Sequence, residues 1–553
     1  MRGVNVNNIR LLDCTLRDGG YINNWNFGQK SIKKIIEKLA ISNIDIIECG
    51  FVRDVEFTNN KSIFNDVETI KEFISPKNRN ITYVGMIDQP YIPIDRIKDY
   101  DGTSIDGFRL TFHENEKEIE EALAYGKILM EKGYKVFIQP VGTTSYSDES
   151  LLELIKKVNK LKPYAFYLVD TLGLMYKNDL LRMYHLIDHN LDESISIGFH
   201  SHNNLQLSFS NAQELLMLHT KRKIIIDSSV FGMGRGAGNL CTELVTQYIN
   251  ENIEEKYNVV PILEIIDEHL SKFSSESQWG YSVPYFIAAI NNCHPNYASF
   301  LMNKQTISVK SINTILKQLP LKKRDIYDEL FIEDLYINHQ IHLIDDAENL
   351  DALKRLIANQ KVLIIAPGKS VETQVEKIRE FIKEYNPFIV SVNFNPDTYK
   401  SDAIFISNLK RFDGIADTIK EITNNTLLIT TSNITKLKVN NSLVVNYSDL
   451  LLDNPTISDN AGLMLLNLLN RLSVNKVYLA GFDGFSLDKS TNYYSTELIN
   501  NIEMEELVKK NEVIRKQLAF LEKNMEINFV TTTIYHDLDS NDKTSSLIEL
   551  EAK

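Results

Sequence analysis

The chain has 553 residues, a formal net charge of -14, 43% hydrophobic residues and 24% charged residues. This length exceeds what a single hydrophobic core supports, so we expect two or more domains. The acidic balance argues against nucleic acid or an anionic membrane surface as the main partner. Four cysteines without CxxC spacing exclude a disulfide framework and a thiolate zinc site, and they fit a reducing compartment. The start of the chain lacks signal-peptide character and no apolar run could span a bilayer, so we expect a cytoplasmic protein without membrane insertion.

Strands and helices alternate through the first half of the sequence. Eight apolar, β-rich runs are candidate strands: Leu11–Thr15, Ile44–Cys49, Ile81–Met86, Ile105–Thr111, Lys135–Pro140, Ala165–Asp170, Ser194–His200 and Ile224–Val230. Amphipathic segments lie between and after them: Gln29–Ala40, Lys61–Phe73, Glu116–Glu131, Glu149–Lys160, Lys177–His189, Leu205–His219 and Asn239–Asn250. In the third unit, Pro90 and Pro93 interrupt the helical pattern. Eight βα units in succession predict a (β/α)8 TIM barrel over residues 1–258.

The second half divides into two regions. Residues 259–350 have a mainly helical pattern, which predicts a helical extension or lid packed on the barrel. In residues 351–553, candidate strands recur at Lys361–Ala366, Phe388–Phe394, Ala403–Ile406, Thr426–Thr430, Ser442–Tyr447, Lys476–Ala480 and Glu526–Thr532. The helices expected there are Val371–Tyr385, Ala461–Leu472 and Ile499–Lys523, and the polar tail Asp537–Lys553 is expected to be partly disordered. This alternation predicts a doubly wound, Rossmann-like α/β domain.

Two histidines follow the seventh predicted strand at a spacing that favours a metal site. His200 and His202 are two residues apart, so their imidazoles face the same side of a strand. Asp18 follows the first strand in the motif RDGG, and strands one, seven and eight are neighbours in a closed barrel. An aspartate with two histidines leaves coordination positions open for a substrate, as a catalytic metal requires. The alternatives are exposed loop histidines and a simple ion pair between Arg17 and Asp18.

A glycine-rich loop, GMGRGAGN, runs from Gly232 to Asn239 after the eighth strand. Gly234 and Gly236 would let backbone N–H groups approach an anion such as a substrate carboxylate. The amide oxygen of Asn239 is a candidate for a further metal ligand, or for a group that holds a ligand in place. The alternative is a flexible turn.

Five motifs together resemble the HMG-CoA-lyase-like, or DRE-TIM, metallolyase superfamily: RDGG, IECGF, VDTLG, HSHNN and GMGRGAGN, on strands one, two, six, seven and eight. The similarity covers roughly the first 300 residues and is nearest to proteins of the 4-hydroxy-2-oxovalerate aldolase type. It implies a TIM-barrel enzyme that binds Mn²⁺ or Mg²⁺ through Asp18, His200 and His202, with Asn239 as a further candidate ligand.

The resemblance also implies roles for residues beside the metal. Arg17 would stabilise the negative charge of an enolate. Glu48, at the end of strand two, would anchor Arg17 by a bidentate pair. Thr171 of VDTLG would bind the substrate carboxylate, whereas Asp170 is either a strand-end hydrogen bonder or a substrate contact.

The residue that moves protons is left open by the sequence. The 4-hydroxy-2-oxovalerate aldolases carry a histidine shortly after RDG, but here Tyr21 takes that position, and a phenol is ordinarily a weak base at neutral pH. His113 follows the fourth strand and so also lies at the predicted barrel mouth. His294 and Tyr297 lie in the helical extension, and aldolases of this family use a tyrosine from this later region. His113, His294 and Tyr297 each have a purely structural alternative.

The C-terminal domain carries two glycine-containing turns. The run IIAPGKS ends a strand with Gly368 and Ser370 at a predicted helix start, which can bind an anion, although it lacks the first glycine of a P-loop. Asp483 follows a later strand in the run LAGFDG. The pair resembles DUF115-like domains, which include hydroxymethylpterin-pyrophosphokinase-like proteins and some bacterial glycan-modifying proteins. A docking or oligomerisation domain is the alternative.

The function that this reading favours is a divalent-metal-dependent aldolase or lyase. It would cleave or form a carbon–carbon bond of a 4-hydroxy-2-oxo acid through a pyruvate enolate. One alternative is a Claisen-type condensing enzyme that uses an acyl-CoA. Another is a bifunctional protein whose second domain transfers a nucleotide or sugar phosphate in glycan biosynthesis. We expect a small 2-oxo acid as substrate and assembly into a homo-oligomer.

Overall fold

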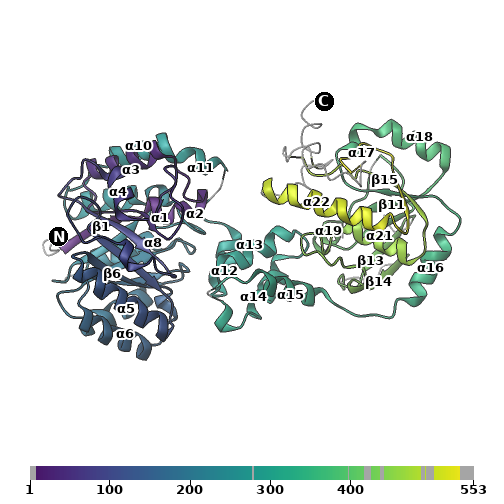
Figure 1. The fold of residues 1–553 in the computed structure, drawn as a ribbon. Coiled ribbons are helices and arrows are strands. Elements are labelled where there is room, and N and C mark those ends of the chain that lie inside the picture. The colour runs from purple at the N-terminus through teal and green to yellow at the C-terminus, as the bar shows by residue number, and fades with distance from the viewer. Residues whose placement is uncertain are drawn as a thin grey trace. The chain divides into compact units, whose positions relative to one another are not determined.

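A computed structural model describes residues 8–535, apart from 219, 277–278, 325, 397, 416–424, 436–440, 487–491 and 493–503. The polar tail and the start of the helix expected at Ile499–Lys523 therefore lie outside the described residues. The chain forms two compact units (Figure 1). The first contains residues 1–296 and 321–327, and the second contains residues 297–320 and 328–553.

The first unit is a closed barrel of parallel strands with helices around it (Figure 1). Neighbouring strands pair all the way round, and β1 also pairs with β2, which closes the ring. The eight barrel strands are β1 Ile9–Asp13, β2 Ile46–Val52, β4 Thr82–Ile87, β5 Gly107–Phe112, β6 Lys135–Pro140, β7 Ala165–Asp170, β8 Ser196–Ser201 and β9 Ile224–Ser228. A two-residue strand, β3 Ile63–Phe64, adds to the edge of β2. The predicted TIM barrel is confirmed.

Helices cover the outside of the barrel because each buries one apolar face against the strands. They are α3 Gln29–Ile41, α4 Val67–Ile74, α5 Glu116–Glu131, α6 Asp148–Leu161, α7 Lys177–Asn190, α8 Ser208–Leu216 and α9 Thr242–Asn252. The helix expected from Lys61 begins only at Val67, where the Asp66 carboxylate accepts a hydrogen bond from the Thr69 N–H and so caps its start. The interrupted third unit has only a 3-10 turn, Ile94–Arg96, close to its prolines.

The helical region after the barrel is divided between the two units. Helices α10 Val260–Ile265, α11 Ser271–Glu276 and α12 Val283–Ile290, with a π-helical turn at Ile266–Leu270, belong to the first unit. Helices α14 Val309–Lys317, α15 Glu329–Gln340 and α16 Ala347–Ile357 belong to the second, as does almost all of α13 Pro295–Lys304. The division between the units thus falls within the region for which the sequence predicts one helical extension.

The second unit contains an open sheet of seven parallel strands in the order β14-β13-β12-β11-β10-β15-β16. The strands are β10 Val362–Ile365, β11 Phe388–Val392, β12 Ala403–Ile406, β13 Leu427–Thr431, β14 Ser442–Val445, β15 Lys476–Ala480 and β16 Glu526–Phe529. The chain moves outward from β10 to β14 and then returns to the other side of β10 at β15. This reversal is the topological switch point of a doubly wound sheet.

Helices pack on both faces of this sheet. Alternate residues of β10 point to opposite faces. Ile364 joins a core with α16, α21 (Ala461–Arg471) and α22 (Met504–Leu521), whereas Leu363 and Ile365 join a core with α18 (Val375–Tyr385). The helices of this unit's second half are α17 Ser370–Thr373, α18 Val375–Tyr385, α19 Leu409–Ile415, α21 Ala461–Arg471 and α22 Met504–Leu521. The predicted α/β architecture of the C-terminal region is confirmed.

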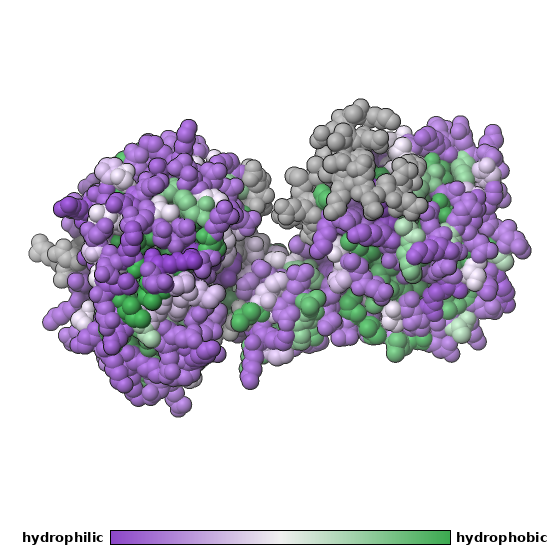
Figure 2. Space-filling view, in the orientation of Figure 1, coloured by the Kyte–Doolittle hydropathy of each residue, from purple (hydrophilic) through white to green (hydrophobic). Residues whose placement is uncertain are grey.

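Hydrophilic residues cover most of the face of each unit that is visible in Figure 2. Hydrophobic residues appear on it in separate patches, as is ordinary for a protein whose apolar side chains mainly fill internal cores. Within the described residues, every helix is too short or too polar to cross a membrane.

Candidate metal centre

Three side chains suited to bind a divalent metal meet at the carboxyl end of the barrel. His200 lies on β8 and His202 directly follows it, whereas Asp18 ends the short helix α1, Thr15–Asp18, after β1. Their ligand atoms all lie within 4.8 Å of one another, and all three residues are buried. Strand β1 ends at Asp13 rather than Thr15, so the RDGG motif lies on a helical turn. Barrel closure brings together residues that are nearly two hundred positions apart in the sequence.

The donor set fits a metal ion. The Nδ1 atom of His202 is buried without a hydrogen-bond partner among the described residues, and so is the Oδ1 atom of Asn239. Buried polar atoms of a folded protein are normally satisfied, so unused lone pairs beside a carboxylate indicate a position for a cation. Burial lowers the pKa of His202 to about 3, against the partial opposition of the Asp18 charge. The imidazole is therefore neutral near pH 7, the form that binds metals.

The charge of Asp18 is also set by its surroundings. Burial by itself would raise the pKa of this carboxyl, but Arg17 and the two histidines outweigh burial and hold the pKa well below its usual range. Asp18 is therefore an anion at neutral pH. Two imidazole side chains and one carboxylate together form a donor set that a divalent metal can use without a thiolate.

Asn239 orients Asp18 through a hydrogen bond. Its Nδ2 donates to Oδ2 of Asp18 at 2.5 Å and to the Met233 carbonyl at 3.2 Å. A Cβ on Gly234 would stand 2.2 Å from this Nδ2 and 2.8 Å from the Asp18 oxygen, so only glycine fits there. Gly236 has a φ of +68°. The glycine-rich loop is therefore shaped by close packing around the metal ligand, and its contact with a substrate carboxylate stays a prediction.

Arg17 is held beside Asp18 by Glu48. The Arg17 guanidinium donates from Nε to Oε2 of Glu48 at 2.9 Å and from Nη1 to Oδ1 of Asp18 at 2.5 Å. Glu48 anchors Arg17 as predicted, but the predicted bidentate geometry is wrong. A single oxygen of Glu48, Oε2, accepts hydrogen bonds from both Arg17 and Arg109. The Nη2 of Arg17 is buried without a partner among the described residues, so it retains donor capacity for a substrate oxygen.

Two buried charges that the sequence analysis missed support this site from inside the barrel. Arg109 on β5 is fully buried and donates to Glu48 at 2.7 Å and to Oδ2 of Asp227 on β9. The same Asp227 oxygen lies 3.0 Å from Nδ1 of His200, which leaves Nε2 of that imidazole to bind a metal. A chain of charges thus connects Arg17 to His200.

A sequence signal for this network exists. Arg109 stands in the apolar run GFRLTF and Asp227 in the run IIID, each inside a predicted strand. A charged residue inside a buried strand needs a partner of opposite charge, so the two could have been paired from the barrel topology.

Asp18, His200 and His202 open onto a cavity of about 220 Å³ at the barrel mouth. Arg17, Tyr21, His113 and Thr171 also line it, so four of the residues expected to act on a substrate share one cavity with Asp18. The Thr171 hydroxyl oxygen accepts a hydrogen bond from the Gly142 N–H at 2.8 Å and keeps its own proton to donate. Asp170 instead accepts from the N–H groups of the following loop, which identifies it as a strand-end hydrogen bonder.

Tyr21 and His113 differ in how firmly they are held. Tyr21 packs edge-on against Trp25, with ring centroids 4.9 Å apart, and the Arg235 guanidinium lies 5.6 Å from its ring centroid. The His113 side chain is half exposed, and its Nδ1 lies 3.2 Å from a carboxylate oxygen of Glu118. Tyr21 is therefore positioned by rings and a cation, whereas His113 stands at a more open edge of the cavity.

His294 and Tyr297 have structural partners. His294 is buried, its Nδ1 accepts a hydrogen bond from the Asn296 N–H at 3.2 Å, and its ring stacks on Tyr327. Tyr297 belongs to the second unit, where it is fully buried and its hydroxyl accepts from the Asp328 N–H at 3.1 Å. Neither lines the barrel-mouth cavity within the described residues, and their acid/base roles stay predictions.

The candidate anion site of the C-terminal domain is filled by a side chain of the protein. The Ser370 N–H donates to Oδ2 of Asp483 at 2.7 Å, and the Ser370 hydroxyl donates to the other carboxylate oxygen. A Cβ on Gly368 would stand 2.4 Å from the Gly481 carbonyl, so this glycine lets two loops pack together. An anion at the Ser370 amide would have to displace Asp483.

The closed (β/α)8 barrel and the buried Asp-His-His group define the class of a TIM-barrel enzyme with a metal site at its carboxyl-terminal face. Residues 8–267 match the family model described as HMGL-like, a family whose members depend on divalent metals. The resemblance of residues 351–553 to DUF115-like domains stays a prediction.

Several curated proteins match part of this chain. The chain is similar to an oxaloacetate decarboxylase of Mycobacterium tuberculosis, 26% identical over 231 residues, which are 41% of this chain and 66%, just under two thirds, of that protein. It is also similar to a 4-hydroxy-2-oxovalerate aldolase of Geobacillus genomosp. 3, 23% identical over 261 residues, which are 46% of this chain and 75% of that protein. Among solved structures, an HMG-CoA lyase from Brucella melitensis aligns with 15% identity and a TM-score of 0.37, covering 48% of this chain and 97% of that one.

Proposed function

We propose that the barrel is an aldolase or lyase that acts on a 4-hydroxy-2-oxo acid and passes through the enolate of pyruvate. The observation that supports this most strongly is the unpartnered Nη2 of Arg17 beside the Asp18, His200 and His202 group. A permanent positive charge aimed at a developing enolate oxygen stabilises the transition state more than the substrate.

Each residue at the mouth has a defined part in this proposal. Asp18, His200 and His202 would hold Mn²⁺ or Mg²⁺, which when bound would supply a Lewis acid for the 2-oxo acid. Arg17 donates from Nη2 to the enolate oxygen, and Glu48 prevents its guanidinium from turning away. The Thr171 hydroxyl donates a hydrogen bond to the substrate carboxylate.

Tyr21 is our candidate for the acid/base group, which as a phenolate would take the proton from the substrate hydroxyl. It lines the same cavity as Arg17 and Asp18, and its ring is fixed by Trp25 and Arg235. His113 lines the cavity too and is the alternative. Tyr21 and His113 contact different neighbours, so substituting each one separately can show which of them transfers the proton.

The relatives carry names for different reactions that share one step. Decarboxylation of oxaloacetate and cleavage of a 4-hydroxy-2-oxo acid both form the enolate of pyruvate. Arg17 and the Asp18, His200 and His202 group would therefore serve either reaction. A 2-isopropylmalate synthase of Sulfolobus acidocaldarius is also similar, 25% identical over 303 residues. Release of free thiol from an acyl-CoA would detect that Claisen-type alternative.

Proton exchange at the pyruvate methyl group tests the proposal. Pyruvate in D₂O is followed by proton NMR with the full chain and Mn²⁺ or Mg²⁺ at catalytic concentrations. We expect metal-dependent loss of the methyl signal, abolished in Asp18→Asn and retained in Asp179→Asn, a change on the exposed side of α7. Absence of exchange in a wild-type protein shown by calorimetry to bind the metal would count against a pyruvate enolate.

A further inference from the structure

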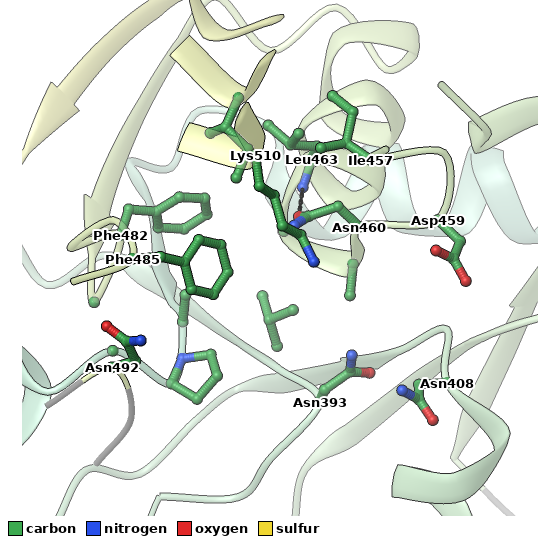
Figure 3. A pocket seen from close by; sticks show the side chains of 18 of the residues that line it. Asn393, Asn408, Ile457, Asp459, Asn460, Leu463, Phe482, Phe485, Asn492 and Lys510 are labelled. Atoms are coloured by element: carbon green, nitrogen blue, oxygen red, sulfur yellow. Dashed lines mark hydrogen bonds between the residues drawn. The ribbon is translucent and has the colours of Figure 1, made fainter. Parts of the chain in front are cut away.

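A cavity of about 230 Å³ opens in the second unit at the carboxyl ends of its central strands (Figure 3). Its walls include residues that follow β10, β11 and β15, such as Pro367, Asn393 and Phe482. Strand β10 lies between β11 and β15, where the order of the sheet reverses. Ligands of open parallel sheets bind outside the strand ends at this kind of switch point. The cavity is thus located where a doubly wound domain binds small molecules.

One wall of this cavity is aromatic. Phe482 and Phe485, in the loop after β15, present their rings on the same side of the cavity (Figure 3). A Cβ on Gly462, in the first turn of α21, would lie 2.9 Å from the Phe482 ring, so the glycine lets the ring lie against the helix start. Aromatic faces of this kind stack on planar rings with little dependence on ring identity.

Positive charge reaches the same cavity from two helices. The Lys510 side chain extends from α22 toward the Asn460 side of the cavity, with its Nζ 5.3 Å from the Phe485 ring centroid (Figure 3). Arg411 of α19 also lines the cavity. The first turn of α21 adds its N-terminal dipole, with Asn460 as the capping residue. An aromatic wall with cations beside it matches a planar ring that carries phosphate.

The carboxylates of the cavity are occupied by structural contacts. Asp459 accepts a hydrogen bond from the Tyr336 hydroxyl, and Asp483 accepts from the Ser370 N–H at 2.7 Å. The wall opposite the phenylalanines carries side-chain amides instead, from Asn393 and Asn408 (Figure 3). Asn408 donates to the Gln305 carbonyl at 3.2 Å and accepts from the Arg411 N–H at 3.1 Å. An amide has a second N–H and a second lone pair, so it can still bind the polar edge of a base or a ribose.

We propose that this cavity binds a nucleoside phosphate. The base stacks on Phe482 and Phe485, and the phosphate is held by Lys510 and Arg411. The proposal is independent of the barrel reaction, because every residue named belongs to the second unit.

Isothermal titration of the full chain with ADP, UDP and CMP tests the proposal, with inorganic phosphate as the phosphate-only probe. We expect at least one nucleotide to bind at least about tenfold more tightly than phosphate, because the aromatic wall adds stacking to charge. Lys510→Gln should weaken that binding about tenfold. Lys516→Gln is the matched control, since Lys516 lies on the same helix, pairs with Glu512 at 2.8 Å and is outside the cavity lining.

The outcomes separate the proposal from its alternatives. Failure of all three nucleotides to bind at millimolar concentration overturns it and favours a docking domain. Phosphate binding as tight as nucleotide binding rejects recognition of the base. Equal effects of Lys510→Gln and Lys516→Gln, in variants with wild-type melting temperatures, place any nucleotide elsewhere.

Discussion

Oδ2 of Asp227 lies 3.0 Å from Nδ1 of His200, and the same oxygen accepts a hydrogen bond from Arg109. This arrangement fixes the imidazole so that Nε2 faces the metal position, and Arg109 keeps Asp227 charged. Burial by itself would raise the pKa of Asp227, but the Arg109 charge and the His200 contact lower it below its usual value. The orientation of a metal ligand on β8 is thus set by residues on β9 and β5.

Asp227→Asn should weaken metal binding by roughly 10-fold to 100-fold, the usual effect of removing the partner of a metal-binding histidine. The amide keeps the shape of the carboxylate but loses the charge that fixes the His200 tautomer. Calorimetric titration with Mn²⁺ measures the change, and circular dichroism verifies the fold. An unchanged metal affinity in folded Asp227→Asn would show that His200 needs no such partner.

Arg109→Met should lower the free energy of unfolding of the barrel by about 3–5 kcal/mol, because Glu48 and Asp227 would remain buried without their shared cation. Urea denaturation followed by circular dichroism measures the loss. Arg96→Met is the matched control, because Arg96 pairs with Asp54 on the surface with half of its side chain exposed, and such pairs contribute about 0–1 kcal/mol. Equal losses in the two variants would contradict a structural role for the buried network.

Tyr21→Phe should slow the cleavage of a 4-hydroxy-2-oxo acid by roughly 10²-fold to 10⁴-fold, the range for loss of a general acid or base. Metal affinity should stay at the wild-type value, because Tyr21 is outside the group of Asp18, His200 and His202. Steady-state rates with saturating Mn²⁺ give the comparison. The matched variant is His113→Gln, and a larger loss in that variant would assign the proton transfer to His113.

His294 should make the protein less stable at acidic pH. Burial, with the nearby Arg235 charge, lowers the pKa of His294 from 6.5 to about 3. Between pH 6.5 and pH 3, His294 binds a proton in the unfolded chain but not in the folded chain. The free energy of unfolding therefore falls as the pH drops from 6.5 toward 3. In His294→Gln this contribution is missing, and the unfolding free energy should fall less steeply between pH 7 and pH 5.

The control for this pH experiment is His185→Gln, a change on the exposed surface of α7. Its denaturation curves should shift with pH as the wild-type curves do. If the free energy of unfolding depended on pH in the same way in His294→Gln and in the wild type, His294 would have to bind its proton in the folded protein as well.

The eight barrel strands and the Asp18, His200 and His202 group were predictable because their signals are local. Apolar runs at the strand period, helical spacing between them and an HxH pair are all properties of short segments. The predicted element boundaries were wrong where a local contact or turn outweighed the hydrophobic periodicity. The Asp66 cap starts α4 later than periodicity indicates, and the strand before RDGG ends at Asp13, with a helical turn following.

The sequence by itself determined the fold class, the choice of Asp18, His200 and His202 as a candidate metal group, and the alternation of strands and helices in the second domain. Only the tertiary structure showed that Arg109 and Asp227 join Glu48 to His200, that Asp483 fills the helix start at Ser370, and that Phe482, Phe485 and Lys510 line one cavity. These contacts join residues far apart in the chain. Periodicity and spacing describe neighbours along the sequence, whereas closure of the barrel and the strand order of the open sheet decide which distant side chains meet.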